Sequence, residues 1–341
     1  MTPDTTQMPS ADLLCPHGSH EDNRQMQPTP TNTEETVLFT EKMQVVVGIA
    51  TSSRPTILAE LVRQLAHQTV KPHRIIISYA KPDDISAIPQ TLRDMASVEF
   101  VTGHQGAAVQ RNVILDRLKD EDIVLFFDDD FFPHPTYIAR IIEAFRDNPN
   151  ILGATGHVLA DGAQGPGLLI EDANRLNAQA DTAAVSKIED AFNTYGCNMA
   201  FRCAAIKRLG ARFDERLPLY SWYEDIDFSR SLLPHGRVVK VNSAQGVHLG
   251  NKTGKGSELR LGYSQIINCI YLAQKGTYPW SNALKSAGRH LVINTLKSFR
   301  PEYYIDRKGR LLGNLIGLGD LLRNRITPER AATLHSNKKA S

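Results

Sequence analysis

The chain has 341 residues, of which 41% are hydrophobic and 22% are charged, with a formal net charge of +2. These values are typical of a globular protein with room for one large domain or two modest ones. No run approaches the roughly 18 apolar residues of a transmembrane helix, and no signal peptide opens the chain. We therefore expect a cytoplasmic protein, soluble or peripheral at the inner face of the plasma membrane.

Charge is divided unevenly along the chain. Residues 281–341 contain twelve Lys or Arg and four Asp or Glu, a surplus of eight positive charges, so the other 280 residues are net acidic. This asymmetry favours a basic segment that faces an anionic surface. The four cysteines, at positions 15, 197, 203 and 269, form no CxxC pair, which is typical of reduced thiols in a cytosol.

Residues 1–42 are poor in large apolar side chains and rich in Thr, Pro, Gln and Asn, so we expect a disordered tail. Cys15, His17 and His20 lie close together in this tail. They lack an evident fourth ligand, and we do not expect a zinc site there.

Strands and helices then alternate. An apolar strand at 45–50 runs into a polar turn and an amphipathic helix that begins near Pro55 and ends near Gln68. Short strands follow at 75–78 and 98–101, and a helix at 106–118. This alternation predicts an α/β fold whose sheet is mostly parallel and nucleotide-binding, flanked by helices.

The stretch 121–135, EDIVLFFDDDFFPHP, is the most informative in the chain. Its apolar run, 123–127, has the length of a buried strand and ends in Asp128, Asp129 and Asp130. Alternation along a strand would point Asp128 and Asp130 to the same side and Asp129 away. Two like charges so placed repel unless a cation such as Mg²⁺ or Mn²⁺ lies between them. The alternative is an acidic loop that caps the next helix.

A second acidic cluster follows further along. We expect a helix at 137–148, a strand at 151–159, a mobile Gly-rich loop at 161–167 and an irregular segment to Thr194. Residues 195–202 then lead into a helix that ends at Gly210. Three acids, Glu224, Asp225 and Asp227, open a helix that runs to about 233. Acids in a first turn are favoured by the helix dipole, but in this context a catalytic role is the stronger interpretation.

The order of VVVGIATSSRP, QRN, FFDDDFFP, GCNMAFR, FDERLPLYSWYEDIDFSR and VHLG resembles the family 2 glycosyltransferases of the A-type, nucleotide-sugar-binding fold. The resemblance runs from about Gln44 to His248. It implies inverting, hexosyltransferase-type transfer of a sugar from a nucleoside diphosphate donor to an acceptor hydroxyl, with Mn²⁺ or Mg²⁺. It also implies that Asp225 is the general base, assisted by Glu224.

The resemblance assigns further roles by position. The implied metal ligands are Asp130, Asp128 and His248; the donor-binding residues are Thr51, Arg54, Tyr79, Asp83, Arg111, Asp128 and Asp129; the acceptor-binding residues are Asn198, Trp222 and Tyr223.

The chain departs from the family pattern in two places. The usual acidic Asp-Asp-Gly-Ser turn is replaced by SYAKPDD, in which Tyr79 could stack on the base and Asp83 or Asp84 could reach its edge. No Gln-x-x-Arg-Trp follows the Glu-Asp helix, which favours a single-addition enzyme over a processive synthase.

The required chemistry agrees with these roles. A divalent ion neutralises the departing diphosphate, and a carboxylate accepts the proton of the attacking hydroxyl. Glu224 and Asp227 are expected to raise the pKa of Asp225 as neighbouring acids. Lys252, Lys255 and Arg260 lie on or beside a Gly-rich loop, and they either close over the diphosphate or form a solvated basic loop.

Three basic-flanked helices are expected near 259–273, 284–299 and 311–322. They suit the surface of an anionic membrane, or they pack on the catalytic sheet as a helical subdomain. Nucleic acid is not an expected partner, because aromatic residues are sparse among these basic ones.

The sequence thus predicts a catalytic domain at 43–258 and a basic helical extension at 259–341. The expected activity is transfer from a nucleotide sugar, a UDP-sugar first of all, to a saccharide or lipid-linked acceptor in bacterial surface or exported polysaccharide biosynthesis. The alternatives are a sugar-phosphate nucleotidyltransferase and a non-catalytic nucleotide-sugar-binding protein.

Overall fold

The computed structural model describes residues 43–95, 97–181, 187–252 and 256–335. From Met43 onwards these residues belong to one compact unit. The expected disordered tail, the Cys15, His17 and His20 cluster and Lys255 lie outside the described residues.

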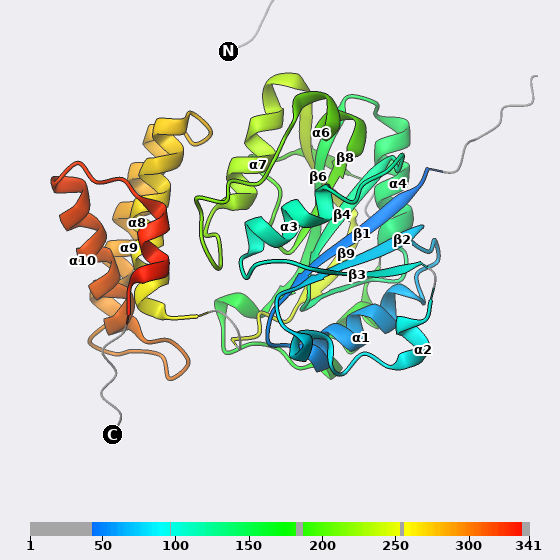
Figure 1. Ribbon diagram of the computed structural model, residues 1–341, viewed down its shortest axis with the longest axis horizontal. Helices are drawn as coiled ribbons and strands as arrows, with labels where there is room; N and C mark the ends of the chain where they lie inside the picture. Colours follow the sequence, from blue (N-terminus) through cyan, green and yellow to red (C-terminus); the bar gives the residue numbers. More distant parts are fainter. Residues whose placement is uncertain (1–42, 96, 182–186, 253–255, 336–341) are drawn as a thin grey trace, which may run out of the picture. The chain divides into compact units, whose positions relative to one another are not determined.

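Four parallel strands form the first half of the sheet, as the sequence predicts (Figure 1). The registers of the central pairs place Ala50 beside both Ser78 and Asp128, so the carboxyl ends of three strands meet at one edge. In spatial order the strands are β3 (Val98–Thr102), β2 (Arg74–Tyr79), β1 (Val45–Thr51) and β4 (Ile123–Asp128).

The second half of the sheet is mixed. β4 pairs with β8 in antiparallel orientation, and β8 pairs with β6 in the same way. β6 and β9 run parallel. The outer pairings of β9, with β5 and β7, are antiparallel. These strands are β5 (Phe131–Pro133), β6 (Ile151–Asp161), β7 (Ile188–Asp190), β8 (Asn198–Arg202) and β9 (Arg237–His248).

Helices cover both faces of the sheet, because its strands are apolar on both sides. Val47, Leu125 and Phe127 face one core, and the alternate residues Val46 and Phe126 face the other. The helices of this part are α1 (Pro55–Leu65), α2 (Gln90–Arg93), α3 (Ala107–Leu115), α4 (Tyr137–Asp147), α5 (Ile170–Gln179), α6 (Cys203–Leu209) and α7 (Glu224–Leu232), with short 3₁₀ turns η1 (Pro82–Ile85), η2 (Gly162–Gln164) and η3 (Leu233–His235).

The structure corrects three expectations in the middle of the chain. The segment expected to be irregular up to Thr194 contains α5 and β7, and residues 198–202 form a strand that is hydrogen-bonded on both sides. The loop at 161–167 is held in place: Asp161 accepts a hydrogen bond from Ala163, and Leu168 donates one to Leu249. For β8, and for the end of the loop at Leu168, partners that are distant in sequence supply the order.

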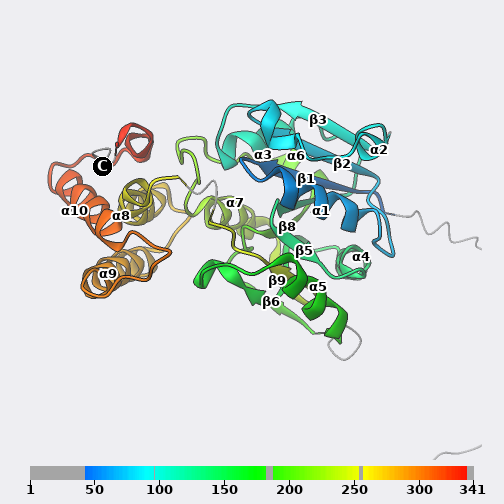
Figure 2. The ribbon, with the colours of Figure 1, turned by 90° about the horizontal axis from the view of Figure 1, so that it is seen from below.

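Three long helices follow the sheet and group together on one side of it in both views (Figures 1 and 2). They are α8 (Glu258–Lys275), α9 (Trp280–Lys297) and α10 (Arg307–Leu322), followed by η4 (Pro328–Thr333). Cys269 and Leu272 of α8 pack with Leu217 and Ile226, which belong to the part that contains the sheet. Helix α8 therefore connects the C-terminal helices to that part. None of the described helices combines the length and the apolar character needed to span a bilayer.

Candidate active site

A cavity of about 600 Å³ opens where the carboxyl ends of β1 and β4 meet the start of α7 and the end of β9. Such an edge is where open α/β sheets bind ligands. Residues of both acidic clusters and of the C-terminal helical part line this cavity. The lining includes Thr51, Arg54, Arg111, Asp128, Asp129, Asp161, Tyr195, Trp222, Tyr223, Glu224, Asp225, His248, Lys252, Arg260, Tyr304, Ile305 and Arg310.

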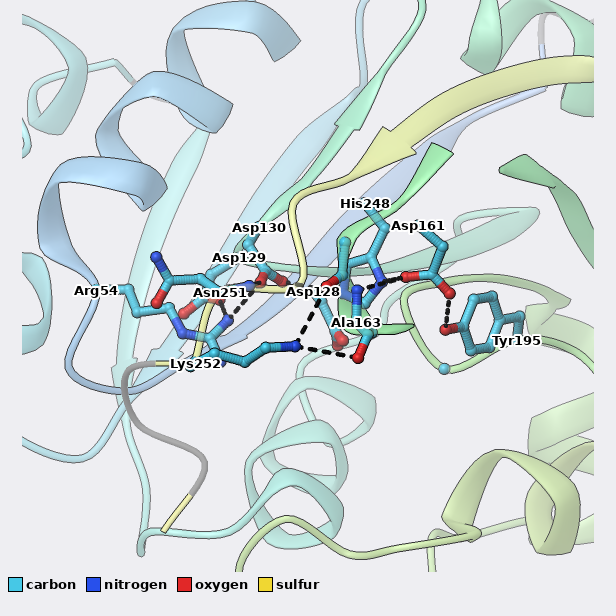
Figure 3. Close-up of polar contacts among 12 residues, drawn as sticks. Arg54, Asp128, Asp129, Asp130, Asp161, Ala163, Tyr195, His248, Asn251 and Lys252 are labelled. Atoms are coloured by element: carbon cyan, nitrogen blue, oxygen red, sulfur yellow. Dashed lines mark hydrogen bonds and ion pairs between the residues drawn. The ribbon is translucent and has the colours of Figure 1, made fainter. Parts of the chain in front are cut away.

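The three aspartates at the end of β4 make two kinds of contact: Asp128 and Asp130 converge with His248, and Asp129 bonds Thr51 and Arg54. β4 ends at Asp128, and the next two residues form a turn. Asp128 and Asp130 each offer an oxygen, and His248 a nitrogen, that lie within 4.8 Å of one another. Asp129 instead accepts hydrogen bonds from Thr51 Oγ1 at 2.8 Å and from Arg54 Nη1 at 2.6 Å. Figure 3 shows the triplet beside Arg54 and His248.

The three converging groups suit a divalent cation. Oδ1 of Asp130 is buried and accepts no hydrogen bond, and it lies 3.4 Å from Nε2 of His248. An orphaned buried carboxylate oxygen is costly without a partner, and a cation would supply one. Two carboxylates and an imidazole are ligands that Mn²⁺ accepts, and the carboxylates also suit Mg²⁺.

The ring of His248 is oriented by Asp161, which the sequence interpretation did not identify as a site residue. Its Nδ1 donates to Oδ1 of Asp161 at 2.8 Å, and Asp161 accepts a second hydrogen bond from the hydroxyl of Tyr195 at 2.7 Å. Burial lowers the pKa of His248, but the nearby carboxylates of Asp130 and Asp161 raise it to about 10, so a cation that binds Nε2 would displace a proton from it. The signal for Asp161 was its position directly after an apolar strand, as for Asp128.

Arg54 balances the charge of the triplet. Its Nη1 lies 2.6 Å from Oδ1 of Asp129 and 3.0 Å from Oδ2 of Asp130. Burial raises the pKa of Asp129 to about 7, and Arg54 opposes that shift. Thr51 and Arg54, both predicted to bind the donor, line the cavity and contact Asp129.

The acids of α7 lie across the cavity. Asp225 accepts hydrogen bonds from the backbone N–H of Ile226 at 2.8 Å and of Gly196 at 3.1 Å. Burial nevertheless raises the pKa of Asp225. The hydrogen bonds fix the carboxylate, and the raised pKa makes it a better proton acceptor than an exposed aspartate.

Arg111 connects the two acidic clusters. Its side chain is buried and donates to Glu224, to Oδ1 of Asp128 at 2.8 Å and to the carbonyl of Gly196 at 3.1 Å. Burial raises the pKa of Glu224 to about 8, although Arg111 opposes the shift. Predicted as a donor contact, Arg111 lines the cavity and also positions both acids.

Asp227 does not belong to this group. Its carboxylate turns toward the C-terminal helices and accepts hydrogen bonds from Lys275 Nζ and Thr277 Oγ1, each at 2.6 Å. The expectation that Asp227 raises the pKa of Asp225 is therefore corrected: burial is the main cause, and the nearby acid that adds to it is Asp128.

The chain that leads into α7 has an unusual backbone. Leu219, Ser221 and Tyr223 all have positive φ, at 59°, 51° and 76°. Such angles cost energy in residues other than glycine and are concentrated at functional sites. Here they bring Trp222 and Tyr223, the predicted acceptor contacts, to the cavity wall.

Four predicted residues are not among those that line the cavity: Asp130, Asn198, Tyr79 and Asp83. Asp130 is buried beside the lining residues Asp129 and His248. Asn198 is fully buried in β8, where its side chain accepts from Thr155. Tyr79 packs against the hydrophobic core, and Asp83 is exposed. Its neighbour Asp84 is buried instead and accepts from the N–H groups of Ser53 and Lys81 at 2.7 and 2.8 Å.

The basic residues after β9 reach the cavity. Nζ of Lys252 donates to the carbonyls of Gly162 and Ala163 at 3.2 and 3.0 Å, and Arg260 donates to the carbonyl of Leu334 at 2.8 Å. The sequence interpretation did not foresee that Tyr304 and Arg310 also line the cavity, since they follow the expected catalytic part by more than forty residues.

Comparison with known proteins agrees with the geometry. Residues 46–210 match the model of glycosyl transferase family 2. A glucosyl-dolichyl phosphate glucuronosyltransferase of Haloferax volcanii is 23% identical over 168 residues, which cover 47% of this chain and 52% of the relative. The match thus spans about half the length of that relative.

Solved structures show the same fold. TarS 1–349 of S. aureus in complex with UDP-GlcNAc has a TM-score of 0.53 and 14% identity, covering 86% of this chain and 84% of that one. The mannosyltransferase PcManGT of Pyrobaculum calidifontis in complex with GDP-Man and Mn²⁺ has a TM-score of 0.52 and 13% identity, covering 82% and 88%. The fold is therefore that of the A-type glycosyltransferases, as predicted.

Proposed function

We propose that this protein is a metal-dependent, inverting glycosyltransferase that moves one hexosyl unit from a nucleoside diphosphate sugar to an acceptor hydroxyl. The observation that carries the proposal is the pairing of a fixed carboxylate of raised pKa, Asp225, with the converging group Asp128, Asp130 and His248, of which Asp128 and His248 line the same cavity as Asp225. A transferase of this type needs a proton acceptor and an anion-stabilising site that are separate from one another.

Asp128, Asp130 and His248 would hold Mn²⁺ or Mg²⁺. When bound, the ion supplies positive charge to the diphosphate as it departs. Asp129 lies beside this group without joining it, and its contact with Arg54 keeps the local charge balanced. Thr51 at the end of β1 and Arg54 just before α1 also line the cavity and are placed to shape its donor side.

Asp225 would remove the proton of the acceptor hydroxyl as the hydroxyl oxygen attacks the anomeric carbon. The C–O bond to the diphosphate breaks on the opposite side, which inverts the configuration. Glu224 and Arg111 position this base: Arg111 holds Glu224 and the carbonyl of Gly196, whose N–H holds Asp225. Trp222 and Tyr223 would form the acceptor side of the cavity.

The donor we propose is a UDP-sugar, and the acceptor a lipid-linked saccharide in the biosynthesis of a surface or exported polysaccharide. The names of the similar proteins support these classes, since TarS is described with UDP-GlcNAc and the Haloferax relative acts on a glucosyl-dolichyl phosphate. We place the protein in the cytoplasm, peripheral on the inner face of the plasma membrane, with a catalytic domain at 43–258 and a helical extension at 259–341.

Calorimetric titration with UDP-, GDP- and dTDP-sugars, with Mn²⁺ and then with a chelator, tests the proposal. We expect sugars of one nucleotide class to bind in the presence of Mn²⁺ and to bind more weakly in chelator. The Asp130→Ala variant should bind that donor weakly both with Mn²⁺ and with chelator. Unchanged affinity in chelator would contradict the metal site. Turnover of a nucleoside triphosphate with a sugar phosphate would identify a nucleotidyltransferase, and donor binding without any transfer a non-catalytic binding protein.

A further inference from the structure

Helix α9 carries a stripe of exposed apolar side chains. Trp280, Leu284, Val292 and Leu296 recur at intervals of four residues or twice four, so they share one side of the helix, and all four are exposed. Ala283 and Asn294 lie on the opposite side and are buried. Exposed large apolar side chains in a row, unlike scattered ones, mark an interaction surface.

Helix α10 and the connection before it carry further exposed apolar side chains. Leu312, Leu315 and Leu322 of α10 are exposed, and in the connection Phe299 and Tyr303 are 81% and 90% exposed. α9 and α10 pack against one another and lie together in both views (Figures 1 and 2). We call these nine residues, together with the two helices' basic side chains, the α9–α10 face.

The charge of this face is mainly positive. The connection contributes two acids: Glu302 is paired with Lys297 and Arg307, and Asp306 caps the start of α10. Helix α9 contains no acidic residue, and Lys285 and Arg289 are exposed on it, with Arg300 just beyond its end. The one acid of α10, Asp320, is buried and bonded to Tyr263 and Arg330. Apolar side chains flanked by cations, with few acids, form the pattern of a helix that lies in the interface of an anionic membrane.

We propose that the α9–α10 face docks on a lipid bilayer that contains anionic lipids, with Phe299 and Tyr303 entering the headgroup region. A second copy of the chain fits the face less well. A symmetric pairing would place the same cationic side chains of both copies against one another, with few acids on the face to neutralise them.

The docking face adjoins the candidate active site through the connection 299–306. Tyr304 and Ile305 line the cavity, next in sequence to the exposed Tyr303, and Nζ of Lys252 lies 5.7 Å from the centre of the Tyr304 ring. An acceptor whose hydrocarbon tail stays in the bilayer could therefore present its saccharide to the cavity beside the same connection. This statement about the acceptor rests on the proposed function.

Flotation of the full chain with vesicles tests the docking. We expect binding to vesicles of phosphatidylcholine with phosphatidylglycerol, weak binding to phosphatidylcholine alone, and weakening by salt. Lys285→Gln, Arg289→Gln and Arg300→Gln together should lower the partition coefficient on the order of 100-fold, since each cation near such a surface contributes about 1 kcal/mol. Leu284→Ser, Leu296→Ser and Phe299→Ser together should lower it even at low salt.

Matched controls lie on the other part of the chain. Lys71→Gln, Lys207→Gln and Arg208→Gln remove the same charge from exposed positions, and Leu169→Ser removes an exposed leucine; both variants should float like the parent. Equal flotation of the parent and the α9–α10 variants, or no flotation of the parent, would overturn the proposal. So would a dimer in solution that the leucine variants convert to monomer. Donor affinity, measured without vesicles, should be the same in all of them, which separates this test from that of the proposed function.

Discussion

Nδ1 of His248 lies 2.8 Å from Oδ1 of Asp161, and this contact aims Nε2 of the same ring toward Asp130. A carboxylate only accepts hydrogen bonds, so Nδ1 carries the proton and Nε2 is left as the ligand nitrogen. Asp161 is in turn held by the hydroxyl of Tyr195. The final residue of β6 thus determines what the final residue of β9 can bind.

Asp161→Asn should weaken Mn²⁺ binding about 10- to 100-fold, because the imidazole loses the carboxylate that orients it. Titration of Mn²⁺, followed by its electron paramagnetic resonance signal, measures this without any turnover. Asp172→Asn, on the exposed side of α5, is the matched control and should bind the ion like the parent. Parent-like affinity of Asp161→Asn would show that the ion does not depend on His248.

Asp225→Asn should keep donor affinity and lower transfer about 10²- to 10⁴-fold, because the amide retains the shape of the side chain but cannot take up a proton. Glu224→Gln should lower transfer less and lower the melting temperature more, since it leaves the buried Arg111 with one carboxylate fewer. Calorimetry with the donor and a transfer assay on each variant separate the effects. Near-parent transfer by Asp225→Asn would place the base elsewhere.

The pH dependence of transfer should report the burial of Asp225. The carboxylate is the active form, so transfer is lost as the pH falls through its pKa, and burial raises that pKa. We therefore expect the acid limb of kcat/KM to have its midpoint above the ordinary aspartate value. The residual activity of Asp225→Asn should lack this limb; if the limb persists unchanged, another group titrates.

Asp227→Asn should lower stability and leave the chemistry intact. Its buried carboxylate bonds Lys275 and Thr277, which ties α7 to the end of α8. Hydrogen bonds to a charged group contribute about 1.5–3 kcal/mol each, so the melting temperature should fall by several degrees. Thermal melts and the transfer assay at a temperature below both transitions test this. A loss of transfer comparable to that of Asp225→Asn would make Asp227 part of the active site.

Much of the fold could be predicted from local pattern. The strands at 45–51 and 123–128 are apolar and β-branched or aromatic, and the first helix begins at a proline with its apolar residues at helical spacing. The helix that begins at Glu224 and the parallel pairing of the first strands could also be predicted from local pattern, whereas the spatial order of the strands could not. β8 was mistaken for the approach to a helix because its order comes from pairing with β4 and β6.

For the site, the sequence by itself determined which residue types are available and where strands end: three aspartates after β4, and a Glu-Asp pair at the start of α7. Only the tertiary structure decided which of them meet. Asp130 converges with His248, Asp129 turns to Arg54, and Asp227 turns to Lys275. Carboxylates that are adjacent in the chain are chemically alike, and their burial and nearest cations, which are distant in sequence, make them different.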